Sequence, residues 1–355
     1  MLSLPRKIGR LYVESFSGLS KEVWLLSLIT LINRSGTVVI IFLSIYLTEQ
    51  LGFSKSQAGI VIGCFGIGSV LGGWIGGLLT DKIGYYKVMF VSLFSVGFFF
   101  VGMAYVTEFY TFCAVVIGTC IVGDMYAPAS NASIAAYSKP ENHSRTLSLI
   151  RLAINLGFAV GSSAVGFIAG AFGYFWLFII DGATCLIAAF AFIAIMTNKK
   201  EEIIEEKEDI DLEETKLLDK SKTEEIRSPY TDGWYYLFLF FSALCAFPFF
   251  QLFTAFPVFT KEVLLFSDFQ YGMIMAFNGL FLFCLEMPII HVLTEKKKEM
   301  QSLYIGAFLI AISFFWFNIF GFYAWVTVLV MVFLVLGEIL NFPFSNAVAL
   351  SRSHP

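Results

Sequence analysis

The sequence predicts an all-α membrane protein that crosses the bilayer many times. Its 355 residues are 58% apolar and only 14% charged, with 41 phenylalanines and a mean hydropathy of +0.79. Soluble domains are about 45–50% apolar and about 25% charged, so this composition excludes a water-soluble globular protein. A series of long apolar segments and an internal repeat support the same fold class.

Ten segments are apolar enough over the roughly 20 residues that a helix needs to cross the hydrocarbon core. We predict membrane-spanning helices over residues 24–48, 57–80, 87–106, 109–131, 147–171, 174–196, 234–259, 269–293, 301–319 and 322–349. With a cytoplasmic N-terminus, 19 of the 23 Lys and Arg residues fall in cytoplasmic connections. The positive-inside rule therefore predicts that the N-terminus is cytoplasmic and that the protein lies in the plasma membrane.

A charged stretch interrupts the apolar pattern after the sixth segment. Twelve of the 27 acidic residues lie between Glu201 and Glu225, among several lysines and without aromatic residues, as is typical of a solvated linker. We therefore predict three parts. These are a six-helix bundle over residues 1–198, a cytoplasmic linker over 199–232, and a second bundle with four helices over 233–355.

The two sides of this linker carry the same motifs in the same order. Phe53-Ser54-x-x-Gln57-x-Gly59 recurs as Phe266-Ser267-x-x-Gln270-x-Gly272, at an offset of 213 residues. Leu79-Thr80-Asp81-Lys82 recurs as Leu293-Thr294-Glu295-Lys296, and Gly123-Asp124 followed by Pro128 recurs as Gly337-Glu338 followed by Pro343. This conserved order indicates duplication of a six-helix unit in parallel orientation. We accordingly expect a truncated chain with 10 of 12 helices.

Other classes of site find little support in the sequence. The six cysteines lie singly in apolar runs, with no CxxC pair and no nearby histidine, which predicts small buried side chains rather than a disulfide or metal site. No catalytic triad, phosphate-binding loop, metal cluster or cofactor motif is present, and no basic stretch suits a nucleic acid. We therefore expect a monomer that is not an enzyme and that needs no cofactor.

One connection carries a motif of a known family. The sequence from Gly72 to Lys87 contains Gly77, Asp81, Lys82, Gly84 and Lys87 in a pattern that closely resembles the G-x-x-x-D-[RK]-x-G-[RK]-[RK] loop of the major facilitator superfamily. The resemblance implies a major facilitator fold of two parallel six-helix repeats. It also implies that this loop, between the second and third helices, acts as a conformational latch.

The fifth predicted helix carries a second family motif. Its residues Asn155, Gly157, Gly161 and Gly166 resemble the antiporter motif of drug:proton exchangers, the multidrug facilitator branch of the superfamily. The resemblance implies a bacterial inner-membrane transporter that works by alternating access. Its implied partners are the lipid bilayer, a small-molecule substrate and protons as the coupling ion.

Six ionisable residues fall inside the predicted helices, where a charge costs about 2.5–3.5 kcal/mol and seldom faces lipid. They are Arg34, Asp124, Arg151, Asp181, Glu286 and Glu338. Four acids and two bases leave at least two carboxylates without an obvious cation, and burial favours the neutral form of such acids. These carboxylates are therefore candidates for reversible proton binding.

Arg34 and its neighbour Asn33 lie near the middle of the first helix, which lines the central cavity in the superfamily. Arg34 is a candidate to bind a substrate anion or a carboxylate, and the alternative is a fixed ion pair that stabilises the bundle. Glu286 precedes Pro288, whose ring frees a backbone carbonyl and favours a kink. We favour a role for Glu286 in proton binding, with a helix-packing hydrogen bond as the alternative.

The remaining charges have weaker assignments. Asp124 and Glu338 occupy equivalent repeat positions shortly before a proline, so they either gate the cytoplasmic side or are satisfied locally. Arg151 is predicted to form a structural ion pair with Asp124. Asp181, near the outer end of the sixth helix, is a further candidate for proton coupling.

Three functional hypotheses follow. The first is proton-coupled efflux of lipophilic, drug-like compounds, as the family motifs imply. The second is proton-coupled uptake of a small polar or anionic solute, which Arg34 favours, as does Ser162 at the place where the antiporter motif usually has proline. The third is a truncated chain that does not transport.

Overall fold

A computed structural model of the chain describes residues 18–36, 39–139, 142–197, 233–295 and 298–353. The chain forms two compact units. Unit 1 comprises residues 1–204 together with 266–279, and unit 2 comprises residues 205–265 together with 280–355. The predicted linker over residues 199–232 lies outside the described residues.

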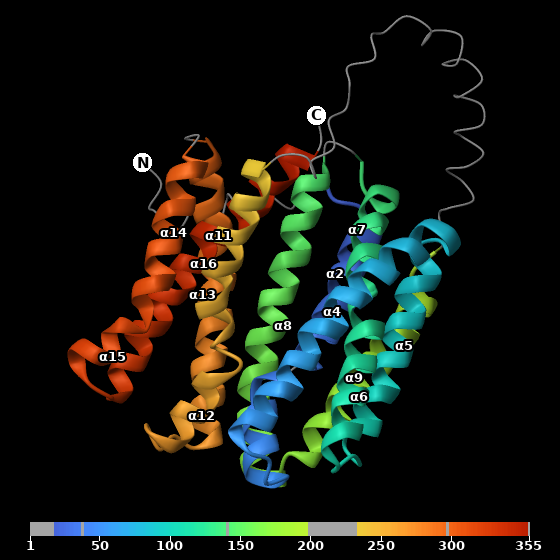
Figure 1. Ribbon diagram of the computed structural model, residues 1–355. Coiled ribbons are helices and arrows are strands. Elements are labelled where there is room, and N and C mark those ends of the chain that lie inside the picture. The colour runs from blue at the N-terminus through green and yellow to red at the C-terminus, as the bar shows by residue number, and fades with distance from the viewer. Residues whose placement is uncertain (1–17, 37–38, 140–141, 198–232, 296–297, 354–355) are drawn as a thin grey trace, which may run out of the picture. The chain divides into compact units, whose positions relative to one another are not determined.

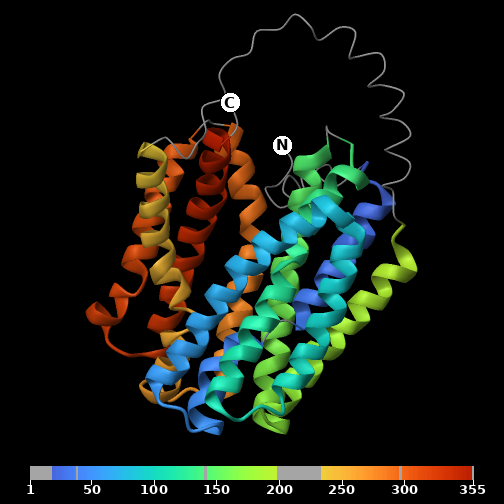
Figure 2. The ribbon, with the colours of Figure 1, turned by 45° about the vertical axis from the view of Figure 1, so that its right-hand side comes forward.

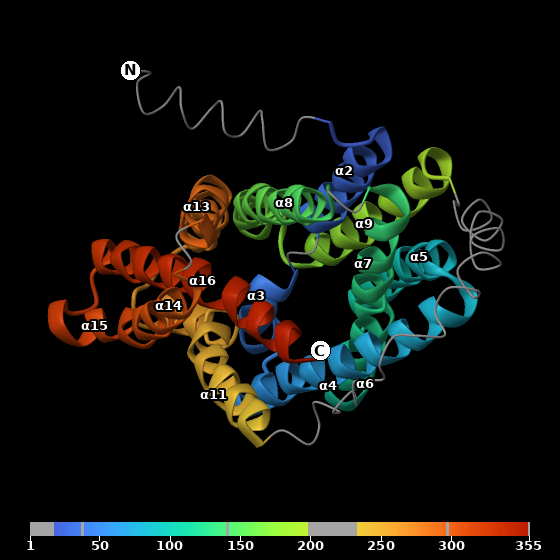
Figure 3. The same cartoon turned by 90° about the horizontal axis from the view of Figure 1, so that it is seen from above.

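Unit 1 is built from helices, and its long helices lie roughly vertical in Figures 1 and 2. In chain order they are α2 (Lys21–Gly36), α3 (Val39–Ile45), the π-helical segment η1 (Tyr46–Gln50), α4 (Lys55–Ile83), α5 (Tyr85–Met103), α6 (Phe109–Asp124), α7 (Tyr126–Tyr137), α8 (His143–Phe172) and α9 (Phe175–Ile195). Seen from above, α2 lies between α8 and α9 and packs on both (Figure 3). The first part of α13 (Asp268–Glu295) also belongs to this unit.

Unit 2 contains the later helices and the rest of α13. Its other members are α11 (Gly233–Phe250), α12 (Ala255–Glu262), α14 (Glu299–Ser313), α15 (Phe315–Phe320) and α16 (Ala324–Ser353). The packing is densest between α14 and α16, where Gly306 and Gly337 let the two backbones approach closely. Between α11 and α12 the helix is interrupted at residues 251–254, which lie between Pro248 and Pro257.

Within the described residues, nine helical stretches are long and apolar enough to cross a membrane. They match nine of the ten predicted spans. The remaining predicted span, residues 301–319, is divided by a turn at Phe314 into the shorter helices α14 and α15. Large apolar side chains such as Trp74, Phe98 and Phe190 are more than half exposed, as a lipid-facing surface requires.

The first repeated motif forms the same helix start in both places. Ser54 accepts a hydrogen bond from the Gln57 N–H, while the Gln57 side chain accepts one from the Ser54 N–H. Ser267 and Gln270 make the same two bonds at the start of α13, with the same lengths of 3.2 and 2.9 Å. This arrangement is a capping box, and it satisfies backbone N–H groups that have no partner within the first turn of a helix. The repeated sequence motif therefore forms two equivalent helix starts.

Helices α4 and α6 approach closely along a row of glycines on α4. A Cβ atom added to Gly68 would lie 2.8 Å from the carbonyl oxygen of Ile117, and one added to Gly72 would lie 2.5 Å from that of Ile121. A Cβ on Gly76 would lie 2.6 Å from the Cα of Met125. Small residues at every fourth position therefore let the two backbones touch, as is common between membrane helices. We call this row the glycine ladder.

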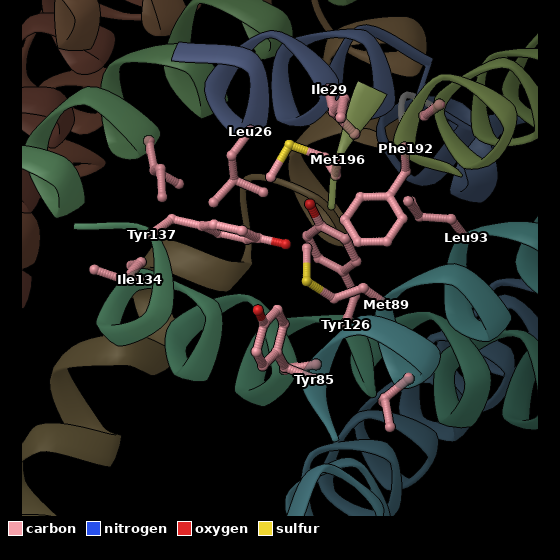
Figure 4. Close-up of a cluster of buried hydrophobic side chains, with 14 of the residues drawn as sticks. Leu26, Ile29, Tyr85, Met89, Leu93, Tyr126, Ile134, Tyr137, Phe192 and Met196 are labelled. Carbon is pink, nitrogen blue, oxygen red and sulfur yellow. The ribbon is translucent and has the colours of Figure 1, made fainter. Parts of the chain in front are cut away.

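The interior of unit 1 is filled by side chains from five helices, of which Figure 4 shows the central part. Leu26, Met89, Tyr126, Phe192 and Met196 converge there. At the edge of this cluster, the hydroxyls of Tyr86 and Tyr137 donate hydrogen bonds to the carbonyls of Met196 and Thr197. These bonds fasten the end of α9 to α5 and α7.

The cysteines only partly follow the prediction of small buried side chains. All six are free thiols, but only Cys120 and Cys185 are buried. Cys64, Cys113 and Cys245 are partly exposed and Cys284 is exposed. The prediction was wrong for these four because hydropathy does not indicate which side of an apolar helix faces outwards.

Candidate functional site

A buried carboxylate contacts the backbone near the middle of the first membrane span. The N–H of Val39, the first described residue of α3, donates a 2.8 Å hydrogen bond to Asp181 Oδ2. Asp181 lies in α9 and is fully buried. A buried backbone N–H needs an acceptor, and Asp181 supplies one here. Asp181 therefore has a structural role here, and its role in proton coupling stays a prediction.

Polar groups gather around Arg34, which lies on α2 two residues before the end of that helix. The Asn33 Oδ1 accepts a hydrogen bond from the Cys185 thiol at 3.8 Å. The Tyr126 hydroxyl lies 3.4 Å from Thr30 Oγ1, and the Arg34 guanidinium acts electrostatically on both Tyr126 and Cys185. Unit 1 thus brings a permanent cation, an amide and a phenol together inside the membrane span, with Asp181 close to Cys185. We call this group the Arg34 cluster.

Helix α8 carries the motif of the fifth predicted helix, and its glycines serve packing. A Cβ on Gly157 would lie 2.9 Å from the Cβ of Arg34, so Gly157 lets α8 sit directly against α2. A Cβ on Gly166 would lie 2.7 Å from the Asp268 carbonyl and 3.0 Å from Gly272 in the first part of α13. Gly161 is buried, whereas Asn155 is partly exposed.

The first part of α13 is joined to unit 1 by polar contacts as well. The Tyr174 hydroxyl donates to Asp268 Oδ1 at 3.1 Å, and the buried Tyr271 hydroxyl donates to the Ile41 carbonyl at 3.3 Å. The Tyr271 ring also packs edge-on against Phe42, with the ring centres 5.1 Å apart. Sequence reasoning missed both tyrosines because they carry no formal charge in an aromatic-rich chain.

Asn278 is a further residue that charge counting missed. It lies in the first part of α13, is only 3% exposed, and its side-chain N–H₂ has no hydrogen-bond partner within the described residues. A buried amide group without a hydrogen-bond partner lowers the stability of the folded state. Such groups are therefore uncommon and call for an explanation, such as a functional role. An asparagine within an apolar span was the signal available in the sequence.

The two carboxylates of unit 2 lie on facing helices. Glu286, on α13, is 3% exposed and follows Leu282 by one helical turn. Leu282 packs against Val335 and Ile339 of α16, so Glu286 lies on the side of α13 that faces α16. Glu338, on α16, is partly buried next to Ile339. Their predicted roles in proton binding and gating stay predictions.

Asp124 lies where the fourth predicted span bends. It is the last residue of α6, and α7 begins two residues later with Pro128 in its first turn. The Ser92 hydroxyl is shared between the carbonyl oxygens of Val122 and Gly123, at 2.6 and 3.2 Å, in the last turn of α6. Arg151 is partly exposed on α8, and its predicted pairing with Asp124 stays a prediction.

In the segment with the family motif, a single residue, Gly84, connects α4 to α5. Gly84 has φ of 85°, and its N–H donates to the Thr80 carbonyl at 3.0 Å. A φ of this sign favours glycine, which explains its place in the motif. Asp81, Lys82 and Lys87 are exposed, and Gly77 has open space beside it. The latch function of these residues stays a prediction.

Comparison with known proteins gives one family and several relatives. Residues 23–355 match the Major Facilitator Superfamily. The uncharacterized MFS-type transporter YqjV of Bacillus subtilis (strain 168) is 24% identical over 322 residues, which are 90% of this chain and 76% of YqjV. Dipeptide and tripeptide permease B of Shigella dysenteriae is 30% identical over 161 residues, which are 43% of this chain and 32% of the permease.

Solved structures share the fold at low sequence identity. A POT family transporter in complex with 5-aminolevulinic acid aligns with a TM-score of 0.76 at 14% identity, over 96% of this chain and 87% of that protein. The peptide transporter POT in complex with sulfate aligns with a TM-score of 0.74 at 17% identity, over 96% and 84% of the two chains. These likenesses confirm the predicted all-α membrane fold.

Proposed function

We propose that this chain, which belongs to the Major Facilitator Superfamily, takes up a small polar or anionic solute together with protons. As a member of that superfamily it is a secondary transporter in a membrane and not an enzyme. Both named relatives are bacterial, and one of them is a dipeptide and tripeptide permease. Small peptides and similar zwitterions are therefore the first solutes to test.

The observation that carries this proposal is the Arg34 cluster. A guanidinium is always charged, and it binds a carboxylate or phosphate through two parallel hydrogen bonds. The same charge repels a lipophilic cation, which is the typical substrate of a multidrug exporter. The cluster therefore favours an anionic or zwitterionic solute over the drug-like compounds that the sequence motifs suggested.

The other predicted site residues enter the same proposal. Asn33 assists Arg34 as a hydrogen-bond partner for the solute, and Glu286 is the first candidate for the coupling proton because it is almost fully buried. Asp124, Asp181 and Glu338 are the alternative proton sites. The loop around Asp81 serves as a conformational latch. In this proposal residues 1–198 and 233–355 move relative to each other, joined by 199–232, with the N-terminus in the cytoplasm.

Proton-coupled efflux of lipophilic compounds is the second candidate. It rests on the likeness of the helix-five motif to that of drug:proton exchangers. The contacts of Gly157 and Gly166 weaken this argument, since both glycines are explained by close helix packing whatever the substrate.

Uptake into proteoliposomes tests the proposal. A radiolabelled dipeptide and a small dicarboxylate are offered with and without an inward proton gradient. We expect gradient-driven uptake that Arg34→Ala abolishes and Arg34→Lys partly retains. Arg145→Ala, which removes an exposed arginine at the start of α8, is the matched control and should transport normally.

The coupling proton is tested by exchange without a gradient. Glu286→Gln should retain exchange of solute between the two sides while losing uptake driven by protons. Glu262→Gln, at an exposed glutamate, is the control. Unchanged uptake in Arg34→Ala contradicts the proposal. Efflux of a lipophilic cation by folded wild-type protein, without uptake of either solute, favours the second candidate.

A further inference from the structure

The glycine ladder has a constant register. Its contacts join Gly68 to Ile117, Gly72 to Ile121 and Gly76 to Met125, which are 49 positions apart in each case. Both helices run in the same direction, so this register continues along the pair. One turn before Gly68, it pairs Cys64 of α4 with Cys113 of α6.

The side chains at this next position are neighbours. Cys64 and Cys113 lie close enough for their thiols to interact. Both residues are free thiols and both are partly exposed, so small molecules can reach them. A disulfide requires Cα atoms about 4.4–6.8 Å apart, and the neighbouring glycine contacts hold the two backbones at a comparably close approach.

We propose that Cys64 and Cys113 form a reversible disulfide site that joins α4 to α6, with a small disulfide compound as its oxidant. In the first step one cysteine sulfur attacks the oxidant, which gives a mixed disulfide and releases one thiol. The second cysteine then attacks the mixed disulfide and releases the other thiol. The two cysteine protons end on the two released thiols, and the oxidant gains the two electrons that the cysteines lose.

The position of the pair predicts what the disulfide does. Both cysteines belong to unit 1, so the new bond closes a loop within that unit. Such a bond restricts the unfolded chain and stabilises the folded one. Because alternating access in this superfamily moves one repeat against the other, a bond within one unit leaves transport intact. The site therefore stabilises the protein rather than switching it off.

The test uses the full-length protein in detergent with 4,4′-dithiodipyridine, a disulfide that releases a coloured thiopyridone at each step. Cys120, Cys185, Cys245 and Cys284 are first replaced by alanine, which leaves only the proposed pair. We expect two thiopyridones per chain, no pyridyl adduct left on the protein, and a mass lower by two hydrogen atoms. Dithiothreitol should restore the starting mass.

Two sets of variants control the test. Cys64→Ala and Cys113→Ala in this background should each release one thiopyridone and retain one adduct. A variant that keeps Cys64 and the exposed Cys284 of unit 2 instead should retain two adducts. Two retained adducts on the Cys64 and Cys113 protein would overturn the proposal. So would an oxidised form that melts at or below the temperature of the reduced form.

Discussion

Leu265 and Gly52 occupy equivalent positions in the two repeats and share a left-handed backbone, with φ of 56° and 68°. Each precedes the Phe-Ser pair that starts a capping box. Leu265 is the only residue other than glycine with positive φ among the described residues, and its side chain is 79% exposed. The backbone of the repeat is thus kept even where the residue best suited to it has been lost.

Leu265→Gly should stabilise the protein. The left-handed conformation costs a residue with a Cβ about 1–2 kcal/mol, part of which glycine loses again through its freer unfolded chain. We expect a net gain of about 1 kcal/mol, measured by thermal unfolding in detergent. Gly52→Ala should lose a similar amount, although nothing lies within 4 Å of the added Cβ. A lower melting temperature for Leu265→Gly would contradict this account.

Two glycines on α8 should respond in opposite directions to alanine. Gly166→Ala places a Cβ against the backbone of α13, and such overpacking costs about 1–3 kcal/mol. Gly170 lies one turn later and faces open space, so Gly170→Ala should gain up to about 1 kcal/mol from helix propensity. Melting temperatures of the two variants give the comparison. Equal shifts would show that α8 does not pack on α13 through Gly166.

Asp181 should stabilise the first span at Val39. Asp181→Ala removes the acceptor of the Val39 N–H, and a buried donor left unsatisfied costs about 1–3 kcal/mol. Asp181→Asn keeps an acceptor oxygen and should cost less. Hydrogen exchange at the Val39 amide reports the bond directly. An unchanged exchange rate in Asp181→Ala would show that the carboxylate is not its partner.

Glu108 should make the start of α6 sensitive to acid. Hydrogen bonds from the Thr111 hydroxyl and from the N–H groups of Thr111 and Tyr110 lower the pKa of Glu108 from its ordinary value of 4.5. Because the folded pKa is the lower one, the stabilisation is complete above 4.5 and is lost as the pH falls through the lowered value.

Glu108→Gln checks that dependence. The variant should melt below the wild type at neutral pH, and the difference should shrink in acid as the wild-type carboxylate becomes protonated. Thr111→Ala removes the largest contributor and should shift the acid midpoint upwards. A difference between Glu108→Gln and wild type that does not change with pH would exclude the carboxylate as its source.

Sequence reasoning recovered those features that depend on hydropathy or on local motifs. Nine spans follow from apolar length alone. The repeat of Ser54 and Gln57 was also visible in the sequence, although its role at a helix start was not predicted. Sequence reasoning also singled out Arg34, since a charge in an apolar segment is conspicuous. It could not show that Asp181 supports Val39, because 142 residues separate the two partners.

Contacts between helices were beyond the sequence for the same reason. The meeting of Cys64 and Cys113 depends on the rotation and register of α4 against α6, and neither is visible in hydropathy. The neutral polar groups of Tyr271 and Asn278 were missed because they carry no formal charge and lie outside the recognised motifs. The helix-five glycines were interpreted as an antiporter motif, but their contacts indicate packing rather than a direction of transport.

The one-residue connection at Gly84 also fixes the distance between the end of α4 and the start of α5. With a single residue between α4 and α5, only two backbone angles could bend the connection, and the bond from Gly84 to Thr80 restrains it further. Spectroscopic labels on the exposed residues Lys82 and Lys87 should therefore keep one separation while the transporter cycles. Any change measured from either label to the other repeat then reports a movement between repeats and not a distortion of the hairpin.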